Sequence, residues 1–247
     1  MRRGMRGWVT MVAGATVLAA TSLATAGPII DVDGWSAIRS DNPEGPGTGI
    51  AIGFTGTLND DTALRTLMSF DLAQVDPTFA APADSRLILT IDREDPSGEP
   101  FDRGGVQVIE LWQLPRGFRS GELGGASWLE ADEDQAWDTP GAIDPGVDLL
   151  LATVSIDLDA PIAGEQLVFA SSQLLGAIQD AIDGQERLNM LLRAPGLEFD
   201  GFASRSLVWT QGPDGASPAQ LVIPEPASLA LMGLGGLLLI RRGRRQA

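Results

Sequence analysis

The sequence lacks four reactive residue types: its 247 residues include no cysteine, histidine, tyrosine or lysine. Without cysteine no disulfide can form, so core packing has to hold the fold together. The absences also exclude Ser-His-Asp and Cys-His nucleophiles, lysine Schiff bases, and zinc sites built on histidine or cysteine. Two kinds of carboxylate chemistry remain open: glycoside hydrolysis by a pair of acids, and calcium binding by oxygen ligands.

Positive charge is scarce as well, and much of it lies at the two ends of the chain. All 17 basic residues are arginine, against 33 acidic residues, and the formal net charge is −16. Seven arginines lie in the terminal segments, so the stretch between them has ten arginines, 32 acidic residues and a net charge near −22. Nucleic-acid binding requires a positive surface, so we expect no nucleic-acid partner. Solubility alone explains the acidic surface, and divalent-cation binding is the alternative.

The first 26 residues have the organisation of a secretory signal peptide. A positive segment with three arginines precedes an apolar stretch over residues 8–20. Ala24 and Ala26 then form a small-residue cleavage pattern, which places the cut between Ala26 and Gly27. We therefore expect an N-terminal signal helix and a mature chain that begins at Gly27.

The C-terminus joins three features in a fixed order: Pro224-Glu225-Pro226, a 14-residue apolar run over residues 227–240, and the arginines Arg241, Arg242, Arg244 and Arg245. As a helix the run would be about 21 Å long, which is short of the roughly 30 Å hydrocarbon core of a bilayer. The arginines should stay on the cytoplasmic side. We expect a short hydrophobic helix that holds the chain only transiently.

This arrangement over residues 224–247 resembles the PEP-CTERM sorting signal. The resemblance implies export through the inner membrane of a Gram-negative bacterium and processing by an exosortase-type membrane enzyme. It also implies transient membrane anchoring, followed by a place at the cell surface or outside the cell. Such proteins are typical of bacteria that make exopolysaccharide and biofilm. An ordinary single-helix membrane anchor is the alternative.

Residues 27–223 predict an all-β domain, which we interpret as a single jelly-roll-like antiparallel β-sandwich. Short apolar runs alternate with glycine, proline, aspartate and asparagine. The expected strands lie at residues 29–32, 35–38, 49–54, 64–70, 86–92, 106–112, 149–158, 166–170, 188–193, 206–210 and 220–223. One segment has helical spacing instead. It predicts a helix of about ten residues with Ser172 as N-cap and Gly184 as the C-terminal stop.

Several motifs of this body are similar to those of the DNRLRE-type domain, which is classed as carbohydrate-binding module family 96. The matching positions are Arg65, Phe70, Asp71, Leu72, Leu87, Leu89, Trp128, Glu130, Trp137, Pro218 and Leu221. Arg86 departs from the pattern, since a small residue usually precedes the position of Leu87. The resemblance implies a jelly-roll sandwich with polysaccharide binding in some members, and assigns no ligand site to named residues here.

Three groups of residues are candidate sites. Trp128 and Trp137 flank a loop and could stack on sugar rings, and burial in the core is the alternative. Asp92, Glu94 and Asp95 form an acidic turn suited to calcium, and a plain turn between strands is the alternative. The acidic stretch at residues 130–134 would place three carboxylates on one strand face, as in some retaining glycosidases, or bind calcium, or form a solvated loop.

Together these patterns predict an exported, non-enzymatic surface or matrix protein whose sandwich binds exopolysaccharide. No cofactor other than calcium is suggested. The expected partners are the exosortase-type enzyme, the membrane during sorting, and an extracellular polysaccharide. A small secreted glycoside hydrolase that acts through carboxylates, and an inert structural matrix component, remain as alternatives.

Overall fold

The computed structural model describes residues 28–44, 51–53, 63–91, 93–96, 105–120, 125–157, 164–198, 205–208 and 219–224. In these residues the chain forms antiparallel sheets and one α-helix, which confirms the all-β prediction. The predicted signal helix and C-terminal hydrophobic helix lie outside the described residues. Within them, no helix has the length and apolar character needed to cross a membrane.

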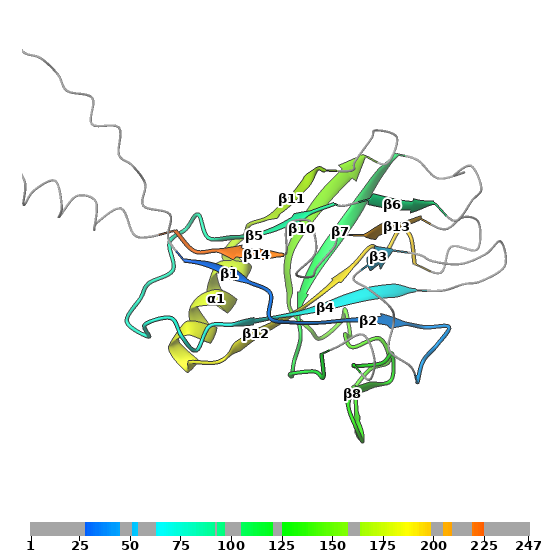
Figure 1. Ribbon diagram of the computed structural model, residues 1–247, viewed down its shortest axis with the longest axis horizontal. Coiled ribbons are helices and arrows are strands. Elements are labelled where there is room, and N and C mark those ends of the chain that lie inside the picture. The colour runs from blue at the N-terminus through cyan, green and yellow to red at the C-terminus, as the bar shows by residue number, and fades with distance from the viewer. Residues whose placement is uncertain are drawn as a thin grey trace, which may run out of the picture.

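Sheet A has four strands in the order β1-β14-β5-β11, so the first and last strands of the described chain are neighbours. Their bounds are β1 Ile29–Asp31, β14 Gln220–Val222, β5 Arg86–Thr90 and β11 Gln166–Phe169. In β5 buried and half-buried residues alternate, as expected for a strand with one face on the core. Figure 1 shows β1 and β14 side by side at the end of the sandwich next to the helix.

Sheet B is larger, with the order β10-β7-β12-β4-β3-β13-β6, and β2 also pairs with β4. Its strands are β10 Leu150–Asp157, β7 Val106–Gln113, β12 Arg187–Arg193, β4 Leu64–Asp71, β3 Ala51–Gly53, β13 Arg205–Val208, β6 Arg93–Pro96 and β2 Gly34–Arg39. A small separate hairpin joins β8 Glu130–Asp132 to β9 Gln135–Ala136. All of the pairings are antiparallel.

The main core lies between sheet A and one face of sheet B. It joins Leu87 and Leu89 of β5 to Phe70 of β4 and to the buried side of α1, which spans Ser172–Gly184. Phe70 and Phe169 are among the largest side chains with no exposed surface. Burial of this apolar surface, in the absence of disulfides, is the main source of stability.

The second face of sheet B is covered too, by the segment between β7 and β10. Seven of the eight residues of β4 are buried, because its two faces serve two different cores. Met68 points into the main core, whereas its neighbour Leu67 contacts a second cluster on the other face. That cluster includes three tryptophans of the β7–β10 region: Trp112, Trp128 and Trp137.

Helix α1 confirms the predicted helix but begins and ends differently. Its N-cap is Ser171 rather than Ser172, and the Ser171 hydroxyl accepts a hydrogen bond from the Leu174 amide at 2.9 Å. Its C-cap is Gln185 in a left-handed conformation with φ 52°, where the sequence suggested a stop at Gly184. The helix is therefore 13 residues long, with Leu174, Ile178 and Ile182 in the main core.

Each of the eleven expected strands appears in the structure, within a few residues of the predicted bounds. Three short strands were not predicted: β6, β8 and β9. All three are rich in charged or polar residues and lack the apolar alternation that marks a half-buried strand.

Candidate functional site

A groove of about 690 Å³ lies beside the first strand of sheet A. It is bounded by β1 and the turn that follows it, and by the end of β4 with the loop that follows it. Ile30, Val75 and Phe79 contribute half-buried apolar surface that packs against the main core. The polar lining consists of four carboxylates and one amide: Asp31, Asp33, Asp71, Asp76 and Gln74.

The loop on one side of the groove is built from side-chain turns encoded in D-L-A-Q-V-D-P-T-F. The Asp71 carboxylate accepts a hydrogen bond from the Ala73 amide at 3.0 Å. Asp76 accepts one from the Thr78 amide at 2.8 Å and one from the Thr78 hydroxyl at 2.7 Å. Aspartate favours such local turns because its short side chain reaches the backbone two residues on. The loop thus presents Phe79 and the two carboxylates in one defined conformation.

Helix α1 holds this loop in place through two glutamines. The Gln179 amide accepts a hydrogen bond from the Ala81 amide at 2.7 Å and donates one to the Phe79 carbonyl at 3.2 Å. Gln185 donates to the Val75 carbonyl at 2.8 Å. Sequence reasoning missed both glutamines, because their partners lie about 100 residues away. One side of the groove is therefore fixed to the sandwich by directional contacts.

The carboxylates of the groove differ in their surroundings. Asp33 forms an ion pair with Arg187 at 2.5 Å, and Asp31 accepts a hydrogen bond from Gln220 at 3.1 Å. The Thr78 hydroxyl, and then the Thr78 amide, lower the pKa of Asp76 below its ordinary value. Asp76 is therefore ionised at neutral pH. A general acid requires the opposite shift, so Asp76 is unsuited to that role.

An apolar floor with a few polar groups is the usual composition of a small-molecule site. Ionised carboxylates accept hydrogen bonds from hydroxyl or ammonium groups, and a half-buried phenyl ring offers a face for the apolar side of a sugar. The same carboxylates repel anions. The groove is therefore chemically suited to a neutral or amine-bearing ligand.

The two tryptophans that were candidates for sugar stacking are buried. Trp128 is 8% exposed and Trp137 is 5% exposed, and both belong to the second cluster. The Trp137 indole N–H donates to the Ser127 carbonyl at 2.9 Å. Neither ring presents a free face for stacking, so the alternative interpretation, a place in the core, is the one observed.

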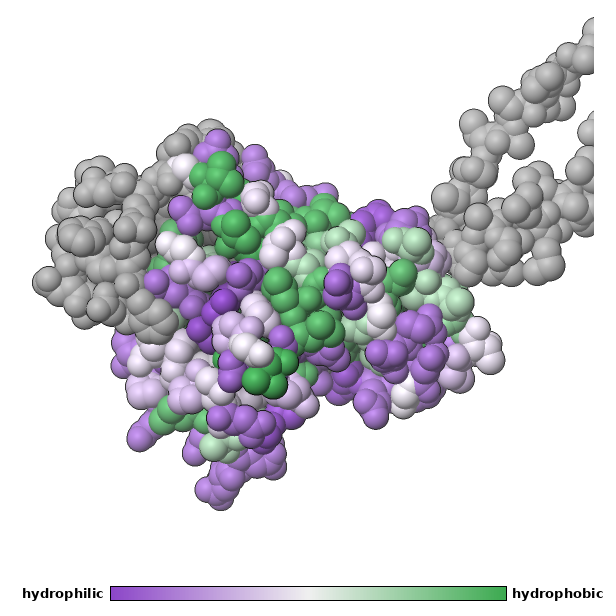
Figure 2. Space-filling model, turned by 180° about the vertical axis from the view of Figure 1, so that it is seen from behind, coloured by the Kyte–Doolittle hydropathy of each residue, from purple (hydrophilic) through white to green (hydrophobic). Residues whose placement is uncertain are grey.

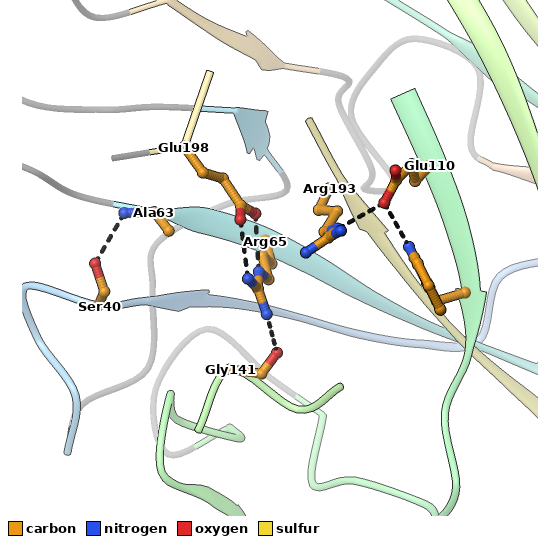
Figure 3. A network of polar contacts seen from close by, with 8 residues as sticks. Ser40, Ala63, Arg65, Glu110, Gly141, Arg193 and Glu198 are labelled. Atoms are coloured by element: carbon orange, nitrogen blue, oxygen red, sulfur yellow. Dashed lines mark hydrogen bonds and ion pairs between the residues drawn. The ribbon is translucent and has the colours of Figure 1, made fainter. Parts of the chain in front are cut away.

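Trp128 packs against a buried polar network on the second face of sheet B. Figure 3 shows Arg65, Glu198 and Gly141 of this network. The Arg65 guanidinium lies 4.7 Å from the centre of the Trp128 ring, donates to both carboxylate oxygens of Glu198 at 2.8 and 2.9 Å, and donates to the Gly141 carbonyl at 2.7 Å. The Arg65 and Glu198 side chains are only 7% and 4% exposed. We assign this network a structural role, since its members are saturated by one another.

A second set of the same kind lies on the adjacent strands. Arg193 of β12 is 2.7 Å from Glu110 of β7 and 5.4 Å from the centre of the Trp112 ring. The Trp112 indole N–H donates to the same carboxylate oxygen at 2.8 Å. Both sets combine an arginine, a glutamate and a tryptophan. In each set the ion pair and the aromatic ring compensate the arginine charge on the face of sheet B that the β7–β10 segment covers.

The candidate calcium residues are only partly described. Asp92 lies outside the described residues, and Glu94 and Asp95 lie in β6, whose side chains are not described. The backbone at residues 93–96 is a strand paired with β13, where the sequence predicted a turn. Among the described residues, no group of three or more acidic side chains is arranged to hold a metal ion.

The acidic stretch at residues 130–134 forms the β8–β9 hairpin, not a single strand. Glu130 and Asp132 lie in β8, whereas Asp134 lies in the turn with φ 59°. Of the interpretations left open for this stretch, the alignment of the three carboxylates on one strand face is not observed, because the chain reverses at residues 133–134. Asp132 and Arg119 form a long ion pair of 3.8 Å.

The two ends of the described chain meet beside the groove. Ile29 is paired with Val222, and the Ile223 amide donates to the Pro28 carbonyl at 3.1 Å. Pro224 follows directly, at the end of β14. The other predicted sorting and cleavage residues lie outside the described residues: Ala24, Ala26, Gly27, Glu225, Pro226, Arg241, Arg242, Arg244 and Arg245.

Residues 222–245 match the family described as the PEP-CTERM protein-sorting motif, which confirms the resemblance inferred from the C-terminal sequence. The motif implies export with transient membrane anchoring in a Gram-negative bacterium, and processing by an exosortase-type membrane enzyme. A comparison with curated proteins gave no significant match. The matched segment is short and lies at the C-terminus, so the match describes how the protein is exported and says nothing about the activity of the sandwich.

Proposed function

We propose that the protein is a non-enzymatic component of the cell surface or extracellular matrix whose sandwich binds exopolysaccharide in the groove beside β1. The observation that carries this proposal is the groove itself, where half-buried Ile30, Val75 and Phe79 lie among four carboxylates. The export signal supports a place where such polysaccharides occur.

The charge of the domain narrows the ligand class. The stretch between the two terminal segments has a net charge near −22, so the domain repels polyanions at long range. The carboxylates of the groove repel them again at short range. We therefore expect neutral or amine-bearing glycans to bind, and uronic-acid polymers to bind only where divalent cations screen the charge.

The test is isothermal titration of the exported mature protein with neutral, amino-sugar and uronic-acid oligosaccharides. The proposal requires binding of a neutral or amino-sugar member, and a loss of at least about tenfold in affinity for Asp76→Asn. Asp138→Asn, which removes a 76% exposed carboxylate outside the groove, is the control and should bind normally. Absence of binding across the panel would contradict the proposal and favour an inert matrix component.

The same samples separate binding from hydrolysis. A carboxylate-dependent glycosidase needs two carboxylates that flank the bound sugar, one of them protonated. We expect no new reducing ends after prolonged incubation with any oligosaccharide that binds. Release of reducing ends that is abolished by Asp71→Asn or Asp76→Asn would show a hydrolase instead.

A further inference from the structure

The sorting motif begins inside the folded domain. The matched segment starts at Val222, which is the last residue of β14. Ile223 has no exposed surface, and its amide donates to the Pro28 carbonyl. Pro224, Glu225 and Pro226 follow at once, and the apolar run starts at Ala227. No spacer therefore separates the sandwich from the residues that the processing enzyme has to read.

Strand β14 is held on both sides. It pairs with β1 through Ile29↔Val222 and with β5 through Arg86↔Val222. Its side chain Leu221 is also fully buried in the main core. An enzyme that takes an extended peptide into its active site needs the backbone and side chains on both sides of the motif. While β14 is in the sheet, its backbone is paired on both sides and the side chains of Leu221 and Ile223 are buried, so these residues cannot enter an active site as an extended peptide.

We propose that the end of β14 at Val222, together with Ile223 and Pro224, has to leave sheet A before the tail can be processed, and that β1 acts as a clasp that limits this release. β1 is the weaker of the two neighbours, since it is a three-residue edge strand with Ile29 51% exposed. The clasp follows directly after the predicted signal-peptide cleavage site, so the start of the mature chain controls access to its end. The inference rests on the assignment of the tail as a processed sorting signal.

A disulfide across the clasp tests this directly, because the chain has no cysteine of its own. Ile29 and Val222 are directly opposed in the antiparallel pair, a spacing that suits a disulfide. The full-length Ile29→Cys/Val222→Cys variant is produced in a Gram-negative host that contains the processing enzyme. Pulse–chase labelling and mass spectrometry of the intact protein then report the loss of the tail, with and without a membrane-permeant reductant.

We expect the oxidised variant to be processed at least about tenfold more slowly than the wild type, and the reduced variant at the wild-type rate. The reduced form controls for the changed side chains. Ile88→Cys/Val168→Cys, which cross-links β5 to β11 in the same sheet, is the matched control and should be processed normally in both states. A four-residue Gly-Ser insertion between Ile223 and Pro224 should restore processing of the oxidised variant, because the motif then clears the sheet.

Processing of the oxidised variant at the wild-type rate would overturn the inference, and so would a block that the inserted spacer does not relieve. A wild-type protein that keeps its tail in this host would overturn both the inference and the sorting function on which it rests. If the wild type loses its tail and the cross-linked variant loses it at the same rate, the clasp is refuted and the sorting function stands.

Discussion

Removal of the Glu198 charge should strongly destabilise the sandwich, because it strands a buried guanidinium. Arg65 and Glu198 are 7% and 4% exposed and are joined by two hydrogen bonds of 2.8 and 2.9 Å. Breaking a buried ion pair from one side costs about 3–5 kcal/mol, since the remaining charge has lost its compensation. Glu198→Gln keeps the side-chain volume and one acceptor, so we expect the lower end, about 3 kcal/mol.

The loss of unfolding free energy is measurable by urea unfolding followed through tryptophan fluorescence. Trp128 serves as a local probe, because its ring lies 4.7 Å from the Arg65 guanidinium. In a domain of this length, about 3 kcal/mol corresponds to a fall in Tm of roughly 6–12 °C. The m-value should stay unchanged if the mutation acts on stability and not on the compactness of the unfolded chain.

An exposed ion pair of the same chemistry provides the control. Arg39 and Asp41 are 2.5 Å apart, with side chains 34% and 35% exposed. The hydrogen bond from Arg39 lowers the pKa of Asp41, but water screens most of this interaction. Asp41→Asn should therefore cost less than about 1 kcal/mol.

The reasoning fails if Glu198→Gln costs no more than Asp41→Asn. A second variant separates charge from packing: Arg65→Met/Glu198→Leu removes both charges and should recover part of the stability lost in the single mutant. Recovery should be incomplete, because the Gly141 carbonyl, 2.7 Å from Arg65 Nη1, loses its donor.

Three further predictions concern the backbone, the helix and pH. Gly141→Ala should lower stability by about 2–4 kcal/mol in the same unfolding assay, because φ is +84° and the new Cβ would lie 2.6 Å from Arg65 Nη1; Gly176→Ala, with open space in α1, should raise it by about 0.5–1 kcal/mol, and equal effects would contradict this. Ser171→Ala should cost about 1 kcal/mol and Ser172→Ala almost nothing, and the reverse order would restore the N-cap expected from sequence. The lowered pKa of Asp76 stabilises the fold above about pH 5 and is lost as pH falls, so the Tm difference between wild type and Asp76→Ala should shrink below about pH 4; a difference that grows in acid would refute the assignment.

The strands were predictable because their signal is local. In β7, V-Q-V-I-E-L-W-Q, and in β5, R-L-I-L-T, short runs rich in apolar residues predict strands, and the structure has a strand at each. β6, with the sequence R-E-D-P, has no apolar residue before its proline. It is a strand because β13 pairs with it, and no local pattern reports that partner.

The candidate sites were harder to predict because they depend on distant contacts. Trp128 and Trp137 lie in a segment rich in charge and glycine, which suggested an exposed loop, yet this segment is folded onto the second face of sheet B. Arg65 was recognised only as part of a motif, while its partner Glu198 lies 133 residues further on. The groove combines β1 with a loop some 40 residues later. The pairing of β2 with β4, and the hydrogen bond from the Asp33 amide to the Ser69 carbonyl, bring the two together.

The exposed apolar surface does not offer a better binding site than the groove. Ile29 lines the groove, and the other large exposed apolar residues of the described part are also aliphatic: Val106, Val108, Leu129, Val147, Leu149 and Val168. On the face shown in Figure 2, apolar side chains form patches that are interrupted by polar ones. Aliphatic patches of this kind lack the aromatic faces and convergent polar groups that orient a sugar. Phe79 is the aromatic residue that lines the groove, and it lies among acceptors.

If the groove binds its ligand as proposed, delivery and binding are coupled in this fold, because both involve strand β1. Ile29 lines the groove and is also the residue of β1 that faces Val222 at the start of the sorting motif. If β14 leaves the sheet, β1 loses its only strand partner among the described residues, and the wall of the groove that it forms is no longer fixed. A ligand that binds the ordered groove therefore stabilises the closed clasp, and by linkage an open clasp weakens the ligand to the same degree. The groove is consequently competent when the end of the domain is closed, and a polysaccharide bound there should hold back any further release of β14.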